Sequence, residues 1–224
     1  ENPAGLIDLK HISKDFVPAE TGPLAWKMKG NESVAFKPFY TYKEGEKYFL
    51  YLDKNIRRII PVPDDAKEIS ATLANPQQDA GLLFYESHRD SESDPVVKEG
   101  REGWMGTQLY GEKSNVMYFL VECPGFKNGN APKATFHVEY FDEGVGTIRI
   151  VYDSSDASVK VWETEPGAWK EAGVIPLTNT KAWKTYECAV PDAKFSARCN
   201  GGDFRFEMNS ENGKPAIGMV KLTR

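Results

Sequence analysis

The chain has 224 residues, 28 basic and 33 acidic side chains for a formal net charge of −5, and 12 % aromatic residues. This length allows one large domain or two small ones with a substantial core, and the composition argues against disorder. No basic run could neutralise phosphates, which excludes nucleic acid as an expected partner. No apolar run approaches the roughly 18 residues of a membrane span, so no membrane partner is expected.

The N-terminal part is predicted to form strands. Its apolar and aromatic runs are separated by the turn-forming pairs Gly22-Pro23, Gly30-Asn31 and Glu44-Gly45. Both faces of the last run are apolar, as in a strand covered on both sides. The predicted strands are Leu6–Leu9, Leu24–Met28, Ser33–Tyr40 and Lys47–Leu52.

A composition change marks a domain boundary near residue 60. Two prolines in Pro61-Val62-Pro63 cannot donate to a sheet ladder and favour an extended linker. We therefore predict a small, partial β-sandwich domain at 1–60 and a jelly-roll-like β-sandwich at 61–224. One short helix is expected at Asp64–Leu73. The polar stretch Asp79–Gly111 is either a functional loop or a set of short strands.

The second half alternates more clearly. In the run after Gly202, Phe204 and Phe206 face one way while Arg205 and Glu207 face the other, as in a strand with one buried and one wet face. Short strands with frequent turns indicate a sandwich, so the fold class is all-β, with two jelly-roll-like β-sandwich domains. The predicted strands are Val116–Glu122, Ala134–Phe141, Thr147–Tyr152, Ser158–Trp162, Lys184–Val190, Phe204–Asn209 and Ile217–Leu222.

The first residues and the cysteines say little about compartment. Glu1-Asn2-Pro3 contains neither a Met nor the start of a signal peptide, so we expect a processed protein or a piece of a longer one. Cys123, Cys188 and Cys199 fit neither a disulfide framework nor a zinc pattern. Two arrangements of the cysteines remain open: one disulfide with one free thiol, or three free thiols.

Catalytic chemistry is poorly supported. Glycoside cleavage needs two carboxylates about 5–9 Å apart, and 33 acidic residues supply such pairs by chance. The concentrated candidates are Asp142/Glu143, Asp153/Asp156 and Asp203/Glu207. His11, His88 and His137 lie in no hydrolase motif, and His137 is expected on the wet face of its strand. No catalytic residue is predicted.

Calcium is the stronger alternative for the acidic turns. Ca²⁺ takes six to eight hard oxygen ligands, which sandwich loops can supply. Asp142, Glu143, Asp153 and Asp156 could converge on one ion if the strands that flank them pair as a hairpin. For Asp153 and Asp156, ordinary turn hydrogen bonds are favoured over a catalytic role. No other cofactor is expected.

Sugar binding would need an exposed aromatic ring beside polar groups. Trp104 and Trp169 have loop-like neighbours, and Trp162 ends a predicted strand. These three are the candidate carbohydrate-binding residues. The competing interpretation is inter-domain packing for Trp104 and Trp169, and core packing for Trp162. Trp26 and Trp183 precede strands and are expected to pack.

Several short motifs resemble a known family. Gly22-Pro23-Leu24-Ala25-Trp26-Lys27, Val34-Ala35-Phe36-Lys37-Pro38-Phe39-Tyr40 and Lys47-Tyr48-Phe49-Leu50-Tyr51 are similar to the region after the catalytic barrel in bacterial β-L-arabinofuranosidase-type glycoside hydrolases. Tyr140-Phe141-Asp142-Glu143-Gly144 and Asp203-Phe204-Arg205-Phe206 resemble the accessory β-sandwich of such proteins. Lys47 stands where the family usually has Arg, and the His pair that commonly follows Phe-Tyr is missing.

The resemblance implies context more than chemistry. In that family the catalytic Cys, its zinc and the glutamates lie in an N-terminal helical barrel, none of which is in this chain. It therefore implies a missing N-terminal catalytic domain as a partner and a secreted or periplasmic location. No family motif surrounds the three cysteines, so no catalytic role passes to them.

Three functions follow from these observations. The first is a non-catalytic accessory region of a glycoside-hydrolase-like protein that binds a polysaccharide or oligosaccharide, or supports the catalytic domain. The second is a structural or interaction sandwich that binds no sugar. The third is a glycoside hydrolase or lyase that uses a carboxylate pair.

Overall fold

The chain divides into two compact units. The computed structural model describes residues 6–8, 24–27, 33–36, 38–44, 47–52, 57–74, 77–85, 91–107, 115–161 and 164–224. The first unit contains Glu1–Ile59 and Asn75–Gln78, and the second contains Ile60–Ala74 and Asp79–Arg224. In the part that the structure describes, no helix combines the length and apolar character that crossing a membrane requires.

The first unit is described through its strands. An antiparallel sheet has the order β1-β5-β4, and β3 pairs with both β2 and β6. The strand predicted at Ser33–Tyr40 is in fact divided between β3 and β4, and Pro38, which opens β4, has no N–H to donate. The bounds are β1 (Leu6–Asp8), β2 (Leu24–Lys27), β3 (Ser33–Phe36), β4 (Pro38–Glu44), β5 (Lys47–Leu52) and β6 (Arg57–Ile59).

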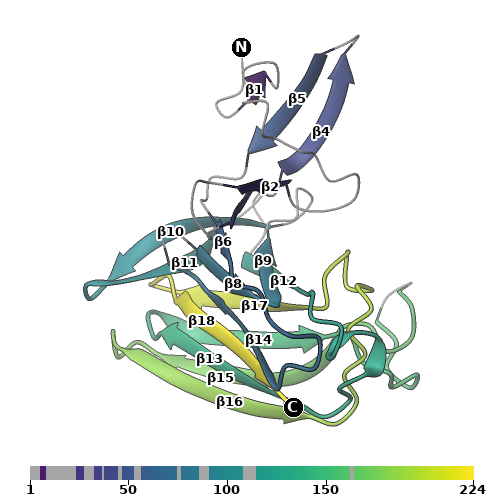
Figure 1. The fold of residues 1–224 in the computed structure, drawn as a ribbon. Coiled ribbons are helices and arrows are strands. Elements are labelled where there is room, and N and C mark those ends of the chain that lie inside the picture. The colour runs from purple at the N-terminus through teal and green to yellow at the C-terminus, as the bar shows by residue number, and fades with distance from the viewer. Residues whose placement is uncertain are drawn as a thin grey trace. The chain divides into compact units, whose positions relative to one another are not determined.

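The second unit is a β-sandwich of two sheets (Figure 1). In sheet I, β18 pairs with β13 on one edge and with β7 and β11 on the other, while β16 lies outside β13 and β10 outside β11. Sheet II has the order β15-β14-β17-β12-β9. The strand pairings just named in sheet I and those of sheet II are antiparallel, and the all-β prediction is confirmed.

The elements of this part of the chain are short. Besides the strands it contains a one-turn 3₁₀ helix, η2 (Lys127–Gly129). The strands are β7 (Glu68–Thr72), β8 (Gln77–Ala80), β9 (Leu82–Tyr85), β10 (Glu92–Lys98), β11 (Arg101–Thr107), β12 (Asn115–Val121), β13 (Ala134–Phe141), β14 (Val145–Tyr152), β15 (Lys170–Thr178), β16 (Trp183–Val190), β17 (Phe204–Glu211) and β18 (Ala216–Thr223).

The core lies between the two sheets and follows the predicted alternation. On β17, Phe204 and Phe206 are fully buried, and on β13, Phe136 faces them from the other sheet. The Phe119 ring stacks on Phe204 with centroids 4.9 Å apart. A second apolar cluster sits on the outer face of sheet II, where loop residues cover Tyr118. The predicted wet face of β17 is thus covered at Arg205, which is only 7 % exposed.

Three predictions about elements are wrong. The helix at Asp64–Leu73 is replaced by β7, because Ile69 and Ala71 enter the core at strand spacing. The described part of Ser158–Trp162 forms no strand, because the chain makes a turn at Asp156–Val159, closed by the Val159 N–H donating to the Asp156 carbonyl. β15 was not predicted, since Pro176 interrupts the strand pattern. A proline is tolerated there because β15 is an edge strand.

The polar stretch Asp79–Gly111 contains short strands, which was one of the two alternatives predicted for it. Its clearest feature is the β10–β11 hairpin, in which Lys98 pairs directly with Arg101. The two residues between them, Glu99 and Gly100, both have positive φ (49° and 74°), as a tight hairpin turn requires. This turn places Arg101 at the start of β11 on sheet I.

Candidate functional site

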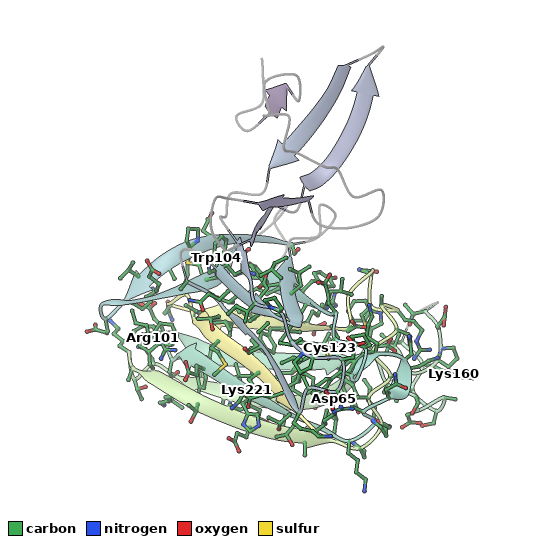
Figure 2. The ribbon with its side chains drawn as sticks, in the orientation of Figure 1. Asp65, Arg101, Trp104, Cys123, Lys160 and Lys221 are labelled. Atoms are coloured by element: carbon green, nitrogen blue, oxygen red, sulfur yellow. The ribbon has the colours of Figure 1, made fainter. Side chains whose placement is uncertain are left out.

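Trp104 is a core residue. It lies in the middle of β11, where it pairs with Ile217, and its side chain is 1 % exposed (Figure 2). The ring contacts Phe84 with centroids 5.6 Å apart. The expectation of an exposed loop tryptophan is wrong, because the glycines at 103 and 106 belong to a strand rather than to a loop.

Trp169 is also buried, at 4 % exposed. Positive φ at Gly167 (94°) and at Trp169 itself (65°) turns the loop back onto sheet II. There the indole meets Tyr118 edge-on, with ring centroids 6.2 Å apart, and the Arg205 guanidinium lies 4.0 Å from its centroid. A ring packed in this way presents no free face to a sugar, so the predicted exposure is wrong here too. Trp162 lies outside the described residues.

Asp142 and Glu143 are held by cations from the protein. Asp142 is fully buried and accepts hydrogen bonds from Thr178 Oγ1 (2.7 Å), Thr180 Oγ1 (2.7 Å) and Lys184 Nζ (2.6 Å). Burial alone would raise the pKa of Asp142, but the bonds from Lys184, Thr180 and Thr178 bring it well below its usual value. Glu143 forms an ion pair with Lys98.

Asp153 and Asp156 lie at the other end of β14. The hairpin expected to bring all four carboxylates together does not form, because β13 belongs to sheet I and β14 to sheet II. Eight residues of strand separate the two acidic turns by about 26 Å. No group of three or more His, Cys, Asp or Glu side chains suited to a metal ion occurs among the described residues. Calcium therefore stays a prediction without a converging ligand set.

Asp156 makes the turn contacts that the sequence favoured. Its Oδ1 accepts from the Ser158 N–H (3.0 Å), and its Oδ2 accepts from Lys170 Nζ (2.9 Å). Hydrogen bonds from Ser158 and Lys170 lower the pKa of Asp156 to about 2. The remaining candidate pair is also engaged by the protein, because Asp203 accepts backbone N–H groups and Glu207 forms ion pairs with Arg149 and Arg205.

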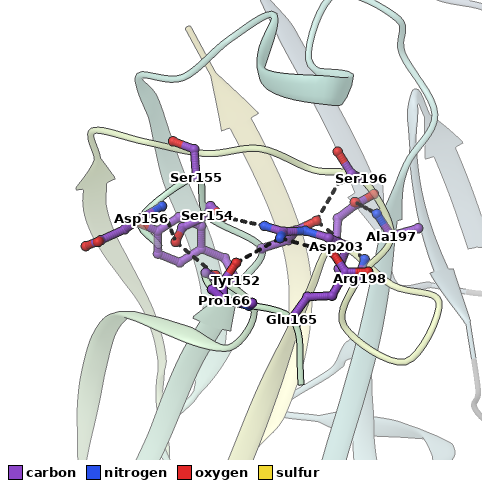
Figure 3. A network of polar contacts seen from close by, with 12 residues as sticks. Tyr152, Ser154, Ser155, Asp156, Glu165, Pro166, Ser196, Ala197, Arg198 and Asp203 are labelled. Atoms are coloured by element: carbon purple, nitrogen blue, oxygen red, sulfur yellow. Dashed lines mark hydrogen bonds and ion pairs between the residues drawn. The ribbon is translucent and has the colours of Figure 1, made fainter. Parts of the chain in front are cut away.

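Asp153 and Asp203 fix two loops rather than a reaction centre. Arg198 extends from one loop and donates to Asp153 Oδ1 (2.6 Å from Nη2), to the Ser154 carbonyl (2.5 Å) and to the Pro166 carbonyl (2.9 Å) (Figure 3). Asp203 Oδ1 accepts the N–H of Ala197 (2.7 Å), and its Oδ2 accepts that of Val121 (2.8 Å). These carboxylate oxygens are occupied by the protein itself, which indicates a structural role.

Asp203 gives the protein a specific pH dependence. Burial raises its pKa to about 6, against about 3.9 for an unfolded Asp. Between about pH 4 and pH 6 the folded state keeps a proton that the unfolded state has released, so stability falls as the pH rises through this window, by about 2–3 kcal/mol. Urea unfolding across this window checks the slope. Asp203→Asn should flatten it, and an equal slope in the variant would contradict the assignment.

The third tryptophan whose side chain the structure describes, Trp183, is partly exposed. It opens β16 and pairs with Phe141 on the outer face of sheet I, where the two rings meet with centroids 5.6 Å apart. Its Nε1–H donates to the Lys98 carbonyl (2.9 Å), which fixes the orientation of the ring. Two glycines make room for it: a Cβ at either Gly103 or Gly218 would lie 2.8 Å from an indole carbon.

An open hollow of about 430 Å³ adjoins this ring. The Arg101 guanidinium lies 4.5 Å from an indole ring centroid of Trp183 and forms an ion pair with Glu139. Arg101 is visible at the edge of the sandwich in Figure 2. We call this surface the Trp183 hollow, and it is lined by Arg101, Glu139, Trp183, Lys184 and Thr185.

The sequence contained a signal for this site that its interpretation missed. On β16 the alternation places Tyr186, Cys188 and Val190 on the inner face, and Val190 enters the core. Trp183 shares the opposite face with the polar residues Thr185 and Glu187. An aromatic residue on the polar side of an alternating strand is the pattern that should have suggested exposure.

No protein-family model and no curated protein matches this chain. Solved structures do. A family 29 carbohydrate-binding module from Piromyces equi aligns over 71 % of this chain and 93 % of its own, with 10 % identity and a TM-score of 0.41. A family 11 module from Clostridium thermocellum, in complex with a β-1,3-1,4-mixed-linked tetrasaccharide, aligns over 69 % and 95 %, with 13 % identity and a TM-score of 0.36.

The CBM22-1 and GH10 modules of endo-1,4-β-D-xylanase 10B from Clostridium thermocellum, complexed with xylohexaose, align over 64 % of this chain and 26 % of theirs, with 16 % identity and a TM-score of 0.42. Scores this low give no information about sites, so the assignment of a site rests on the residues of this chain. Nothing in these matches supports the arabinofuranosidase resemblance, which stays a hypothesis.

Proposed function

We propose that this chain is a non-catalytic carbohydrate-binding β-sandwich that holds a polysaccharide or oligosaccharide at the Trp183 hollow. One observation carries the proposal. Of the three tryptophans whose side chains the structure describes, Trp183 alone is partly exposed, and it lies beside a polar-lined hollow of about 430 Å³.

The lining matches the two kinds of surface that a sugar ring presents. The C–H face of the sugar is apolar and packs on an indole, while the sugar hydroxyls both donate and accept hydrogen bonds. The Arg101 guanidinium supplies donors, the Glu139 carboxylate supplies acceptors, and the Thr185 hydroxyl supplies both. Because the Lys98 carbonyl already fixes the indole, little side-chain entropy is lost when a ligand stacks on it.

Arg101 does not block this mode of binding. Its side chain is 42 % exposed, so the guanidinium can shift off the indole face as a ligand arrives while it stays paired with Glu139. An exposed cation–π contact contributes only about 0.5–1 kcal/mol, which sets the energy needed to move it off the ring. The ion pair with Glu139 keeps the N–H donors of Arg101 close to the indole ring, where they can bond a sugar hydroxyl.

Trp183→Ala is expected to weaken glycan binding by about tenfold or more, the equivalent of at least 1.4 kcal/mol of lost stacking. Affinity electrophoresis through gels containing arabinan, xylan or mixed-linkage β-glucan measures this as a loss of retardation. Trp183→Phe should retain part of the effect, because a smaller aromatic face remains. Tyr186→Ala is the matched control, since Tyr186 is a partly exposed aromatic residue on the other face of the same strand.

The outcomes separate the rival functions. Unretarded wild-type protein in every gel would contradict the proposal and favour a structural sandwich. Release of reducing sugar by the purified chain would favour an enzyme instead. In the proposed role an attached catalytic domain gains effective concentration at its substrate, so a modest affinity suffices. That domain and a secreted or periplasmic location remain part of the hypothesis.

A further inference from the structure

We infer that the Trp183 hollow selects neutral glycans over acidic ones; this rests on the proposed function and names the class of ligand for the same site. The basis is the pairing of charges around the indole. Among the residues that the structure describes, each cation around the indole is matched by a carboxylate of the protein, so these cations offer a sugar acid no unmatched positive charge.

Three ion pairs surround the ring. Arg101 pairs with Glu139, Lys98 with Glu143 and Lys184 with Asp142. The first belongs to the lining itself. In the second, the Lys98 side chain is only 19 % exposed, its ammonium lies 5.7 Å from the Phe141 ring centroid, and it does not line the hollow.

The third pair is the most firmly fixed. Asp142 is fully buried, and besides Lys184 it accepts hydrogen bonds from the hydroxyls of Thr178 and Thr180. Lys184 Nζ also donates to Thr178 Oγ1 (3.2 Å). Drawing Lys184 toward an external anion would leave a buried carboxylate without its cation, and an unpaired buried charge is strongly unfavourable.

A sugar carboxylate would therefore gain little here. To reach Arg101 it would have to displace Glu139 or lie beside it, and two like charges at close range repel. A hydroxyl adds no charge. It can accept from the guanidinium and donate to the carboxylate at once, without breaking the Arg101–Glu139 pair.

Isothermal titration calorimetry of the whole chain tests this with three probes: arabinan and mixed-linkage β-glucan as neutral ligands, and polygalacturonate as the acidic one. We expect at least one neutral probe to bind about tenfold or more tighter than polygalacturonate. Added salt should change the neutral affinity by less than about twofold, because no net charge is exchanged.

A charge variant makes the test sharper. Glu139→Gln removes the carboxylate but keeps the shape, leaving Arg101 without its partner charge, and should tighten polygalacturonate binding by about fivefold or more. Glu187→Gln is the matched control, since it makes the same change of net charge at a residue on the outer face that does not line the hollow. It should leave binding of all three probes unchanged.

The results distinguish the inference from the function it rests on. If polygalacturonate binds more tightly than both neutral probes, and Trp183→Ala abolishes this binding, the inference is wrong but the Trp183 hollow is still the binding site. Equal gains of polygalacturonate binding in Glu139→Gln and Glu187→Gln would also overturn it. Failure of all three probes to bind would instead remove the proposed function.

Discussion

Phe204→Ala is expected to lower the free energy of unfolding by about 3–5 kcal/mol, the usual loss for a fully buried phenylalanine. Phe204 is 0 % exposed and occupies the centre of the sandwich. Its ring stacks on Phe119 of sheet II and meets Phe136 of sheet I edge-on, with centroids 5.0 Å apart. Truncation would open a cavity between the two sheets that neither neighbour can fill without leaving its own strand position.

Denaturant unfolding measures this loss, provided that the slope of the transition stays the same. Asn209→Ala is the control on the same strand, because Asn209 is exposed and should change stability by no more than about 0.5 kcal/mol. A loss below about 1 kcal/mol for Phe204→Ala would mean that the two sheets do not pack through this residue.

Asp153→Ala is expected to cost about 3–5 kcal/mol, as when one partner of a buried ion pair is removed. The carboxylate is 0 % exposed and receives both Arg198 Nη2 (2.6 Å) and the N–H of Ser196 (2.7 Å). Without it, a guanidinium that is only 12 % exposed keeps the carboxylate of Glu165, which is 71 % exposed and lies 3.4 Å from Nη1, in place of a buried countercharge. The loop after β16 would then lose the side-chain part of its attachment to the end of β14, while the backbone bonds from the Lys194 N–H to the Asp153 carbonyl and from the Ser155 N–H to the Asp192 carbonyl remain.

The same unfolding assay and hydrogen exchange in residues 191–203 measure this effect. Lys221→Ala is the control, since its contact with Glu68 is a surface pair at 3.6 Å, worth at most about 1 kcal/mol. A double variant, Asp153→Ala with Arg198→Ala, should lose less than the sum of its parts, because the two residues share one interaction. A strictly additive loss would contradict the pairing.

Local patterns were enough to predict most of the strands. The Ala134–Phe141 segment coincides with β13, because its side chains follow the period of two that a pleated strand imposes, and the apolar run Lys47–Leu52 coincides with β5. β15 was missed because Pro176 breaks this pattern in sequence but is acceptable at a sheet edge, and edges are decided by tertiary pairing. His137 does lie on the outer face as predicted, bonded to Glu187 and Thr223.

The site was harder to predict, since exposure depends on which layer covers a residue. Trp104 and Trp169 have the glycine-rich neighbours of loop residues, yet the facing sheet buries the first and a returning loop buries the second. Trp183 was interpreted as packing because it precedes a strand, although Gly103 and Gly218, far away in sequence, hold it against the outer surface. No local pattern contains those contacts. The three cysteines are free thiols, an outcome that their odd count alone could not decide.

A heteronuclear NMR titration of the whole chain with short neutral arabino-, xylo- and mixed-linkage gluco-oligosaccharides tests the binding surface most directly. The indole N–H signal of Trp183 should shift in a saturable way, with the amides around Arg101, Glu139 and Thr185, while the buried indole of Trp104 should stay in place. Saturable shifts confined to residues outside this surface, or no shifts with any of the sugars, would contradict it.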